Sequence, residues 1–179
     1  MVHESLYLTT HEAALAVVAT ALKKARQLFS TLAINALLGG ILFSSGGMLY
    51  VMLLAELGGI YATNPGVISV LQALVYPIGL FYVVTMGVDL FNSNILYFTV
   101  GVVRGAVSVT DVLVSLVVSW WLNLVGNIFV CYVMCHYSGI SSTPSMVAAS
   151  VLIVQNKMQL SFVQTLIKAM AGNFFVCLL

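Results

Sequence analysis

The sequence is poor in charged residues. Of its 179 residues only 6% are Asp, Glu, Lys or Arg, whereas 61% are hydrophobic and the mean hydropathy is +1.11. A soluble domain of ordinary composition is about one quarter charged. Five acidic and six basic residues are too few to cover a water-soluble fold of this size. The composition therefore excludes a soluble globular protein and predicts an integral membrane protein in contact with the lipid bilayer.

The sequence also lacks clustered ligands and a basic patch. A formal net charge of +1 gives nucleic acid no surface to bind. Cys131 and Cys135 are one helical turn apart, but no histidine or carboxylate completes a metal set. A haem or quinone enzyme needs paired intramembrane histidines, and His136 stands alone. We expect no nucleic acid, no metal, no cofactor and no enzymatic activity.

The apolar runs predict four membrane crossings, because a crossing helix needs roughly 20 apolar residues. The crossings are expected at 28–54, at 67–103 with an interruption near 89–94, at 111–137 and at 158–179. A polar stretch at 138–145 opens the loop that leads to the fourth crossing. Residues 28–179 thus form one transmembrane domain.

Residues 1–27 are expected to form an amphipathic lead-in helix at the cytoplasmic surface. Thr9 and Glu12 fit a capping box, in which the N-cap and N3 side chains satisfy each other's exposed backbone donors. A cluster of basic residues follows within this segment, and Arg104 comes after the second crossing. Basic residues favour the cytoplasmic side of membrane helices. The N-terminus is therefore expected in the cytoplasm, with Lys157 on the opposite side.

Small residues recur in the first crossing. Ala36, Gly40 and Ser44 are spaced four apart, so they share one helix face. Such residues let helix backbones approach closely in lipid, where no hydrophobic force drives helices together. Asn123 and Asn127 lie one turn apart in the third crossing and are interpreted as hydrogen-bonding links between helices. These residues predict a packed bundle.

A polar cluster interrupts the second crossing. Residues 86–96 read MGVDLFNSNIL, and Asp, Asn and Ser compete with helix by bonding to nearby backbone. Asp89 and Asn94 mark the expected break, with a second half-helix from about Asn94. Non-helical backbone at membrane depth is tolerated only where protein buries it or where it lines a wet cavity. From the residues alone, two interpretations stay open: a discontinuous helix lining a path for an anion, or an aspartate at the cytoplasmic surface.

Three motifs in order resemble a known family. They are GLFYVVTMGVDLFNSNIL at 79–96, WWLNLVGNIFVCYVMCHYSG at 120–139 and KMQLSFVQTLIKAMAGNFFVCLL at 157–179. Together they resemble the formate/nitrite transporter family, particularly its fungal members. The resemblance implies an all-α, aquaporin-like helical bundle of six helices with a broken second helix, assembled as a homopentamer with a pore in each subunit.

The resemblance also implies a function and a set of site residues. Members pass small monovalent anions such as formate or nitrite, as channels or together with protons. By motif match, Leu90, Phe91 and Asn92 form the inner constriction and Tyr76 lies near the outer one. The family often has threonine at the position of Asn92, so an amide there implies altered selectivity.

Two further positions match the family's pore. The resemblance makes Lys157 the lysine of the outer vestibule that draws anions in, and Asn173 the pore-side asparagine of the fourth helix. The fifth and sixth family helices, with a pore-centre histidine in the fifth, have no counterpart here. The sequence therefore resembles a member truncated in its fourth helix, with about four of six helices, and we expect a lone 179-residue chain to be unstable or inactive.

The residues leave a second function open beside anion transport. A non-transporting membrane subunit or assembly partner that packs by its glycine face would fit the same composition. Neither the oligomer nor the host membrane is determined by the sequence. The plasma membrane is the expected location.

Overall fold

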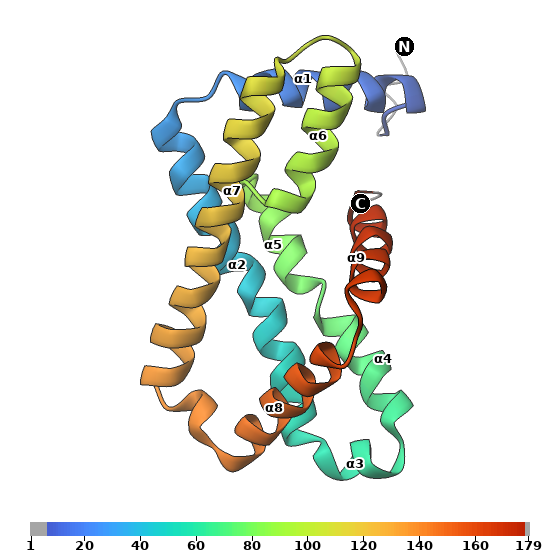
Figure 1. Cartoon of the computed structure of the whole chain (residues 1–179), viewed down its shortest axis with the longest axis vertical. Helices are drawn as coiled ribbons and strands as arrows, with labels where there is room; N and C mark the ends of the chain where they lie inside the picture. The colour runs from blue at the N-terminus through green and yellow to red at the C-terminus, as the bar shows by residue number, and fades with distance from the viewer. Residues whose placement is uncertain (1–6, 178–179) are drawn as a thin grey trace, which may run out of the picture.

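The protein is all-helical over the residues that its computed structural model describes, 7–177. No strand occurs in that part of the chain. The elements, labelled as in Figure 1, are α1 Thr10–Ala25, α2 Phe29–Glu56, α3 Gly58–Thr63, α4 Pro65–Val75, α5 Ile78–Met86, α6 Phe91–Val103, α7 Val109–Phe129, the π-helix η1 Val130–Tyr137, the 3₁₀ helix η2 Ile140–Ser142, α8 Pro144–Met158 and α9 Phe162–Cys177.

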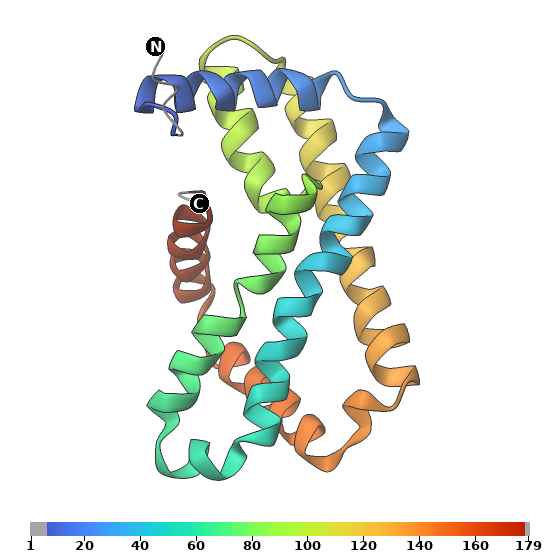
Figure 2. The same ribbon diagram turned by 180° about the vertical axis from the view of Figure 1, so that it is seen from behind.

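Three helical stretches are long and apolar enough to cross a membrane: Phe29–Glu56, Pro65–Met86 and Val109–Tyr137. A fourth candidate is the pair α8 and α9, bent by 108°. In Figures 1 and 2, α2 and α7 run along the molecule, and α4, α5 and α6 form an interrupted column beside them. The predicted fold class, a helical membrane bundle, is confirmed.

Two short helices cross opposite ends of this bundle. α1 lies across the end where α6 and α7 meet their loop, and α8 crosses the other end (Figure 1). The predicted capping box at α1 is confirmed, because the Thr9 N–H donates to the Glu12 carboxylate at 2.7 Å and the Thr9 hydroxyl accepts from the Glu12 N–H at 3.4 Å. The Thr9 N–H and the Thr9 hydroxyl both donate to the Glu12 carboxylate, and they lower its pKa below the ordinary value. Ala21 of α1 is fully buried.

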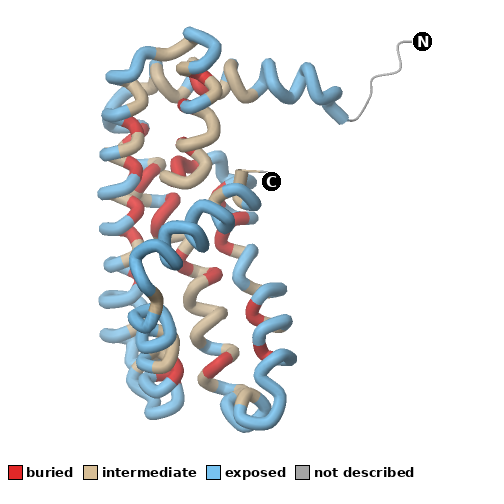
Figure 3. The backbone as a smooth tube through the Cα atoms, turned by 45° about the vertical axis from the view of Figure 1, so that its right-hand side comes forward, coloured by how far each residue is buried: buried red, intermediate tan, exposed pale blue. Residues whose placement is uncertain are grey.

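The close packing of α2 against α7 forms the centre of the bundle. A Cβ atom added to Gly40 would lie 2.3 Å from the backbone oxygen of Asn123, and one added to Gly126 would lie 2.5 Å from that of Leu37. The Ser44 hydroxyl donates to the Asn127 side-chain oxygen at 2.6 Å. Together with the fully buried Ala36, these residues let the two backbones touch. Figure 3 shows the buried positions gathered between the long helices.

The expected second crossing, 67–103, is divided into three helices. Pro77 separates α4 from α5, as expected for a residue that cannot donate a backbone hydrogen bond. The main break follows Met86, where Gly87 takes a left-handed conformation with φ of 64°. The second half-helix begins at Phe91, earlier than the expected Asn94. The predicted boundary was wrong because no local signal marks the start of α6. Its N-cap is Leu90, whose side chain cannot hydrogen-bond to the first turn.

The loop expected before the fourth crossing is largely the helix α8, Pro144–Met158, and this prediction was wrong. The Thr143 hydroxyl accepts from the Met146 N–H at 3.3 Å, and Pro144 occupies the first turn, where its missing N–H costs nothing. Local capping therefore starts a helix within a polar stretch. The following helix α9 begins at Phe162, a few residues after the expected 158.

The order of elements at the start of the chain is repeated near its end. α1 follows the N-cap Thr9 and α8 follows the N-cap Thr143. A lysine lies in the last turn of each short helix, and a longer helix beginning with phenylalanine comes next. Residues 36–40 read ALLGG and residues 169–173 read AMAGN. The α1–α2 pair and the α8–α9 pair are thus two copies of one local arrangement.

Candidate functional site

The unwound backbone between α5 and α6 is held by hydrogen bonds from two other helices. The Asp89 N–H donates to the backbone oxygen of Asn35 in α2 at 3.3 Å. The Asp89 backbone oxygen accepts from the side chain of Asn123 in α7 at 3.0 Å. Polar backbone groups inside a bilayer have no water to bond. These contacts therefore permit the break at this depth in the bundle.

The Asp89 carboxylate is buried and paired. Its side chain is 1% exposed and forms an ion pair with the ammonium of Lys24, whose side chain is 14% exposed. The other carboxylate oxygen accepts from the Gln27 side chain at 3.2 Å. The Lys24 nitrogen also lies 5.5 Å from the ring centre of Tyr97 in α6. A buried charge needs such partners because the desolvation of a lone charge costs several kcal/mol.

Asn123 connects three elements through one side chain. Its amide nitrogen donates to the Ala36 backbone oxygen at 2.6 Å and to that of Asp89 at 3.0 Å, while its oxygen accepts from the Phe91 N–H at 2.8 Å. The last bond caps α6, which has no local cap. Asn127 donates to the Asn123 backbone oxygen at 2.8 Å. The interpretation of both asparagines as links between helices is confirmed.

The three residues proposed for the inner constriction lie where α6 begins. Leu90 is 4% exposed and packs with Leu80, Val83 and Val88. Phe91 and Asn92 are half-buried in the first turn of α6. The backbone N–H of Asn92 finds no hydrogen-bond acceptor among residues 7–177. The first turn of a helix carries partial positive charge, so this turn presents a free donor of the kind that an anion binds.

The other asparagine of the expected break lies inside a helix. Asn94 is 0% exposed in α6, and neither atom of its amide group has a hydrogen-bond partner within the described part of the chain. Its backbone N–H donates to the Leu90 oxygen at 3.0 Å. Asn94 is therefore part of the second half-helix, and the unwound segment is 87–90.

The remaining expected pore residues lie at the end of α4, on α8 and on α9, and α9 reaches the break through Val176, which packs against the cluster that contains Leu90. Tyr76 joins α4 to α5, is 43% exposed, and packs edge-on against Phe43 and Tyr50 with ring centres 5.8 and 6.0 Å away. Lys157 is exposed in the last turn of α8. Asn173 is half-buried in α9, and its side-chain oxygen is buried without a partner among the described residues.

A cavity of about 470 Å³ opens beside the break, bounded by α1, α2, α5 and α6. Its walls include Asp89, Lys24 and Gln27 together with Lys23 and Ser93. Sequence reasoning missed Lys24 and Gln27 as partners of the break, since it considered Lys24 only as an orientation signal and did not consider Gln27. A lone intramembrane aspartate and a lysine in the adjoining helix were the available signal, because such charges pair with one another.

Comparison with known proteins agrees with the three motifs. A family model described as "Formate/nitrite transporter" matches residues 11–179. The chain belongs to the formate/nitrite transporter family. The relatives include "Uncharacterized transporter YHL008C" of Saccharomyces cerevisiae, 54% identical over 178 residues, which covers 99% of this chain and 28% of that protein.

Bacterial relatives in the family are more distant. The "Formate channel BtFdhC" of Bacillus thuringiensis is 30% identical over 162 residues, covering 90% of this chain and 61% of the channel. "Uncharacterized transporter YrhG" of Bacillus subtilis is 27% identical over 167 residues, covering 93% and 62%. The chain thus spans between about a quarter and three fifths of the length of these proteins. These relatives are named as transporters or as a channel.

Proposed function

We propose that the protein moves small monovalent anions of the formate or nitrite type across a membrane, as a channel or together with a proton. Membership of the formate/nitrite transporter family supports this activity over that of a non-transporting subunit. The single structural observation that carries it is the fixed break at 87–90, whose backbone is held by α2 and α7. Non-helical backbone at membrane depth occurs where protein buries it or where it lines a water-filled cavity, and a cavity of about 470 Å³ opens beside this break.

The proposed path runs past the start of α6. Leu90 and Phe91 form an apolar constriction there, and Asn92 offers its side-chain amide and its free backbone N–H to the anion. An anion that leaves water for an apolar constriction needs such donors to offset its desolvation. Tyr76 is proposed for the second constriction. Lys157 is proposed to attract anions from solvent, and Asn173 to donate to them along α9.

The assembly and orientation complete the proposal. The protein forms a homo-oligomer, a pentamer by its resemblance, in the plasma membrane with α1 at the cytoplasmic face. Lys23, Arg26 and Arg104 are exposed, and basic residues favour the cytoplasmic side. The lead-in helix, residues 1–27, is proposed to lie at the membrane surface, and the transmembrane domain, residues 28–179, within the bilayer; residues 1–6 and 178–179 lie outside the described part of the chain. Transport, without catalysis, is the proposed function of the protein.

Flux into liposomes tests the proposal. The purified protein is reconstituted, and uptake of formate, nitrite and sulfate is followed, with the Bacillus thuringiensis formate channel as a positive control. The transport proposal predicts that formate and nitrite enter and that the divalent sulfate is excluded, whereas an inactive lone chain, as expected from the sequence, would pass none of the three. Asn92→Leu is expected to lower formate flux at least tenfold without lowering thermal stability. Equal flux of sulfate and formate contradicts the proposal, whereas no flux where the control channel conducts agrees with the expected inactivity of the lone 179-residue chain.

A further inference from the structure

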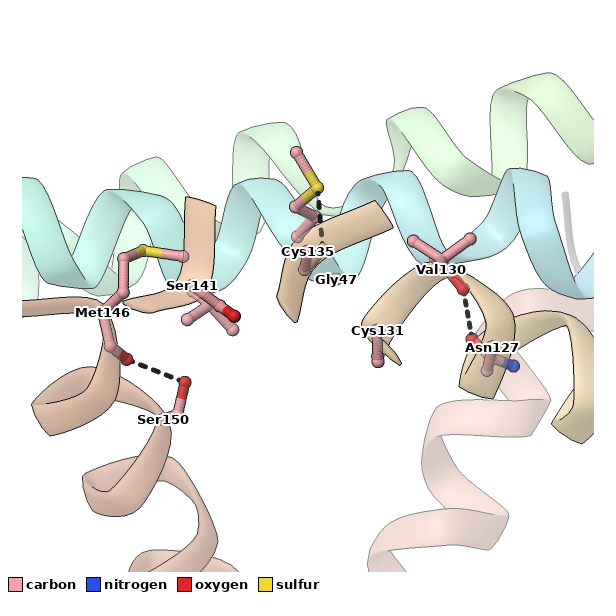
Figure 4. A pocket seen from close by; sticks show the side chains of 11 residues that line it. Gly47, Asn127, Val130, Cys131, Cys135, Ser141, Met146 and Ser150 are labelled. Carbon is pink, nitrogen blue, oxygen red and sulfur yellow. Dashed lines mark hydrogen bonds between the residues drawn. The ribbon is translucent and has the colours of Figure 1, made fainter. Parts of the chain in front are cut away.

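A sulfur-rich cavity lies at the end of the bundle opposite α1. It has a volume of about 430 Å³ and is bounded by α2, by η1 and by α8 (Figure 4). Four side chains in its wall carry sulfur: Met48, Cys131, Cys135 and Met146. The other lining residues are serine, glycine, valine and asparagine, so none of the lining residues is acidic or basic.

Two of these sulfur atoms meet across different helices. The Cys135 Sγ lies 3.5 Å from the Met48 Sδ, the contact dashed beside Cys135 in Figure 4. Metal–sulfur bonds are about 2.3 Å long, so two of three sulfurs spread evenly around one ion are about 4.0 Å apart. The observed spacing is about half an ångström shorter. A small separation of the two side chains would therefore let both sulfur atoms bind one ion.

A third sulfur lies one turn away on η1. Cys131 precedes Cys135 by four residues, lines the same cavity and is a free thiol, as is Cys135. Both cysteines belong to the π-helix Val130–Tyr137, which has 8 residues. π-helical turns are rare, are mostly single turns, and occur frequently at functional sites. The longer π-helix here places two thiols on one wall of the cavity.

We infer that Met48, Cys131 and Cys135 form a binding site for a soft monovalent metal ion, Cu(I) or Ag(I). Thiolate and thioether ligands select such ions. On binding, each cysteine thiol releases its proton to water, and the ion links α2 to η1. No group of three or more His, Cys, Asp or Glu suited to a metal occurs in the described part of the chain. The site therefore depends on the Met48 thioether. Zn²⁺ is held by cysteine, histidine or carboxylate ligands, of which the cavity wall supplies only the two cysteines, so we expect it not to compete.

Metal binding to the purified, reduced chain in detergent tests this site. Native mass spectrometry is run after addition of Ag⁺ or Cu(I), and after Zn²⁺ as the comparison ion. We expect one Ag⁺ or Cu(I) per chain and no Zn²⁺. The double variant Cys131→Ser, Cys135→Ser is expected to lose the ion, and Met48→Leu to weaken its binding at least tenfold. Cys177→Ser, which alters a cysteine outside the cavity, is the matched control and keeps the ion.

Three outcomes overturn the proposal. One is full binding by the double variant, and another is loss of the ion in Cys177→Ser. The third is a bound-metal count that follows the number of cysteines, which would indicate adventitious thiol binding. Where the double variant elutes as aggregate, the Met48→Leu result decides, because this exchange preserves side-chain volume and both thiols. Unchanged affinity in Met48→Leu then overturns the site. None of these outcomes depends on anion flux.

Discussion

The α1–α2 and α8–α9 pairs carry the same local pattern in different surroundings. In the first pair, a Cβ atom on Gly39 would lie 2.3 Å from the Asp89 backbone oxygen, whereas one on Gly172 of α9 meets nothing within 4 Å. Ala36 is fully buried and Ala169 is exposed. Figure 3 shows α9 largely exposed along its length. Caps and composition are thus enough to form the helices, but a broken helix must lie alongside to bury their small-residue face.

The two lysines differ in the same way. Lys24 at the end of α1 forms an ion pair with the buried Asp89, whereas Lys157 at the end of α8 is exposed and has no ion-pair partner among residues 7–177. The same residue at the same place in the pattern is therefore structural in one copy. In the other copy it is exposed to solvent.

The largest expected effect comes from breaking the ion pair. Lys24→Met leaves the Asp89 carboxylate, 1% exposed, without its cationic partner. Removal of one member of a buried pair costs about 3–5 kcal/mol. We expect a loss of this size in the free energy of unfolding, measured by denaturant titration in detergent micelles.

Two further variants test whether the loss of stability comes from the unpaired Asp89 carboxylate rather than from the exchange of lysine for methionine. Lys157→Met makes the same exchange at an exposed site, where changes are usually within about 0.5 kcal/mol. The double variant Lys24→Met, Asp89→Asn removes both charges and is expected to regain much of the lost stability. Equal destabilisation by Lys24→Met and Lys157→Met would refute the structural contrast between the two copies.

The second largest effect is expected when alanine replaces the crowded Gly39 of α2 and the open Gly172 of α9. Gly39→Ala forces a methyl group against backbone atoms, which cannot turn aside as a side chain can, and overpacking of this kind costs about 1–3 kcal/mol. Gly172→Ala meets open space, and alanine favours helix over glycine by up to about 1 kcal/mol. The same substitution is thus expected to lower the unfolding temperature at one glycine and to leave or raise it at the other. Thermal scans of both variants decide this, and a loss at both sites would contradict it.

The apolar helices could be predicted from the sequence because their signals are local. A run of apolar residues at 28–54 needs no partner to be recognised as a crossing, and the Thr9–Glu12 capping box is contained in one turn. The helix α8 was missed for a related reason: its cap, Thr143, lies in a stretch whose serine and glycine content indicates a loop. Composition outweighed a correct local signal there.

The candidate site was harder to predict because its contacts are distant in sequence. Asp89 and Lys24 are 65 residues apart, and Phe91 is capped by Asn123 rather than by a neighbour. The polar cluster at 86–96 correctly indicated an interruption. It could not indicate where helix resumes, since that depends on an amide supplied by another helix.

The third effect concerns the two asparagines. Asn123→Leu leaves the Phe91 N–H and the Ala36 and Asp89 backbone oxygens without their partner, and a buried polar group without one costs about 1–3 kcal/mol. We expect a loss of stability in that range. Asn173→Leu removes a side chain whose oxygen has no partner in the described chain, so its stability is expected to change little while formate flux falls. Equal loss of stability in both variants, measured by denaturant titration, would contradict this distinction.

The smallest effect is a pH dependence confined to one of the two short helices. Glu12 caps α1, and the hydrogen bonds from Thr9 lower its pKa, whereas the equivalent position after Thr143 is Met146. A carboxylate with a lowered pKa stabilises the folded helix above its unfolded pKa, and this stabilisation is lost as the pH falls through the folded pKa. Amide hydrogen-exchange protection in the first turn of α1 is therefore expected to fall between neutral pH and about pH 3, while that of α8 stays constant. Glu12→Gln keeps a capping side chain that does not titrate, and it should abolish the difference in pH dependence between α1 and α8. If protection falls with pH in both helices, or still falls in α1 of Glu12→Gln, the effect belongs to another group.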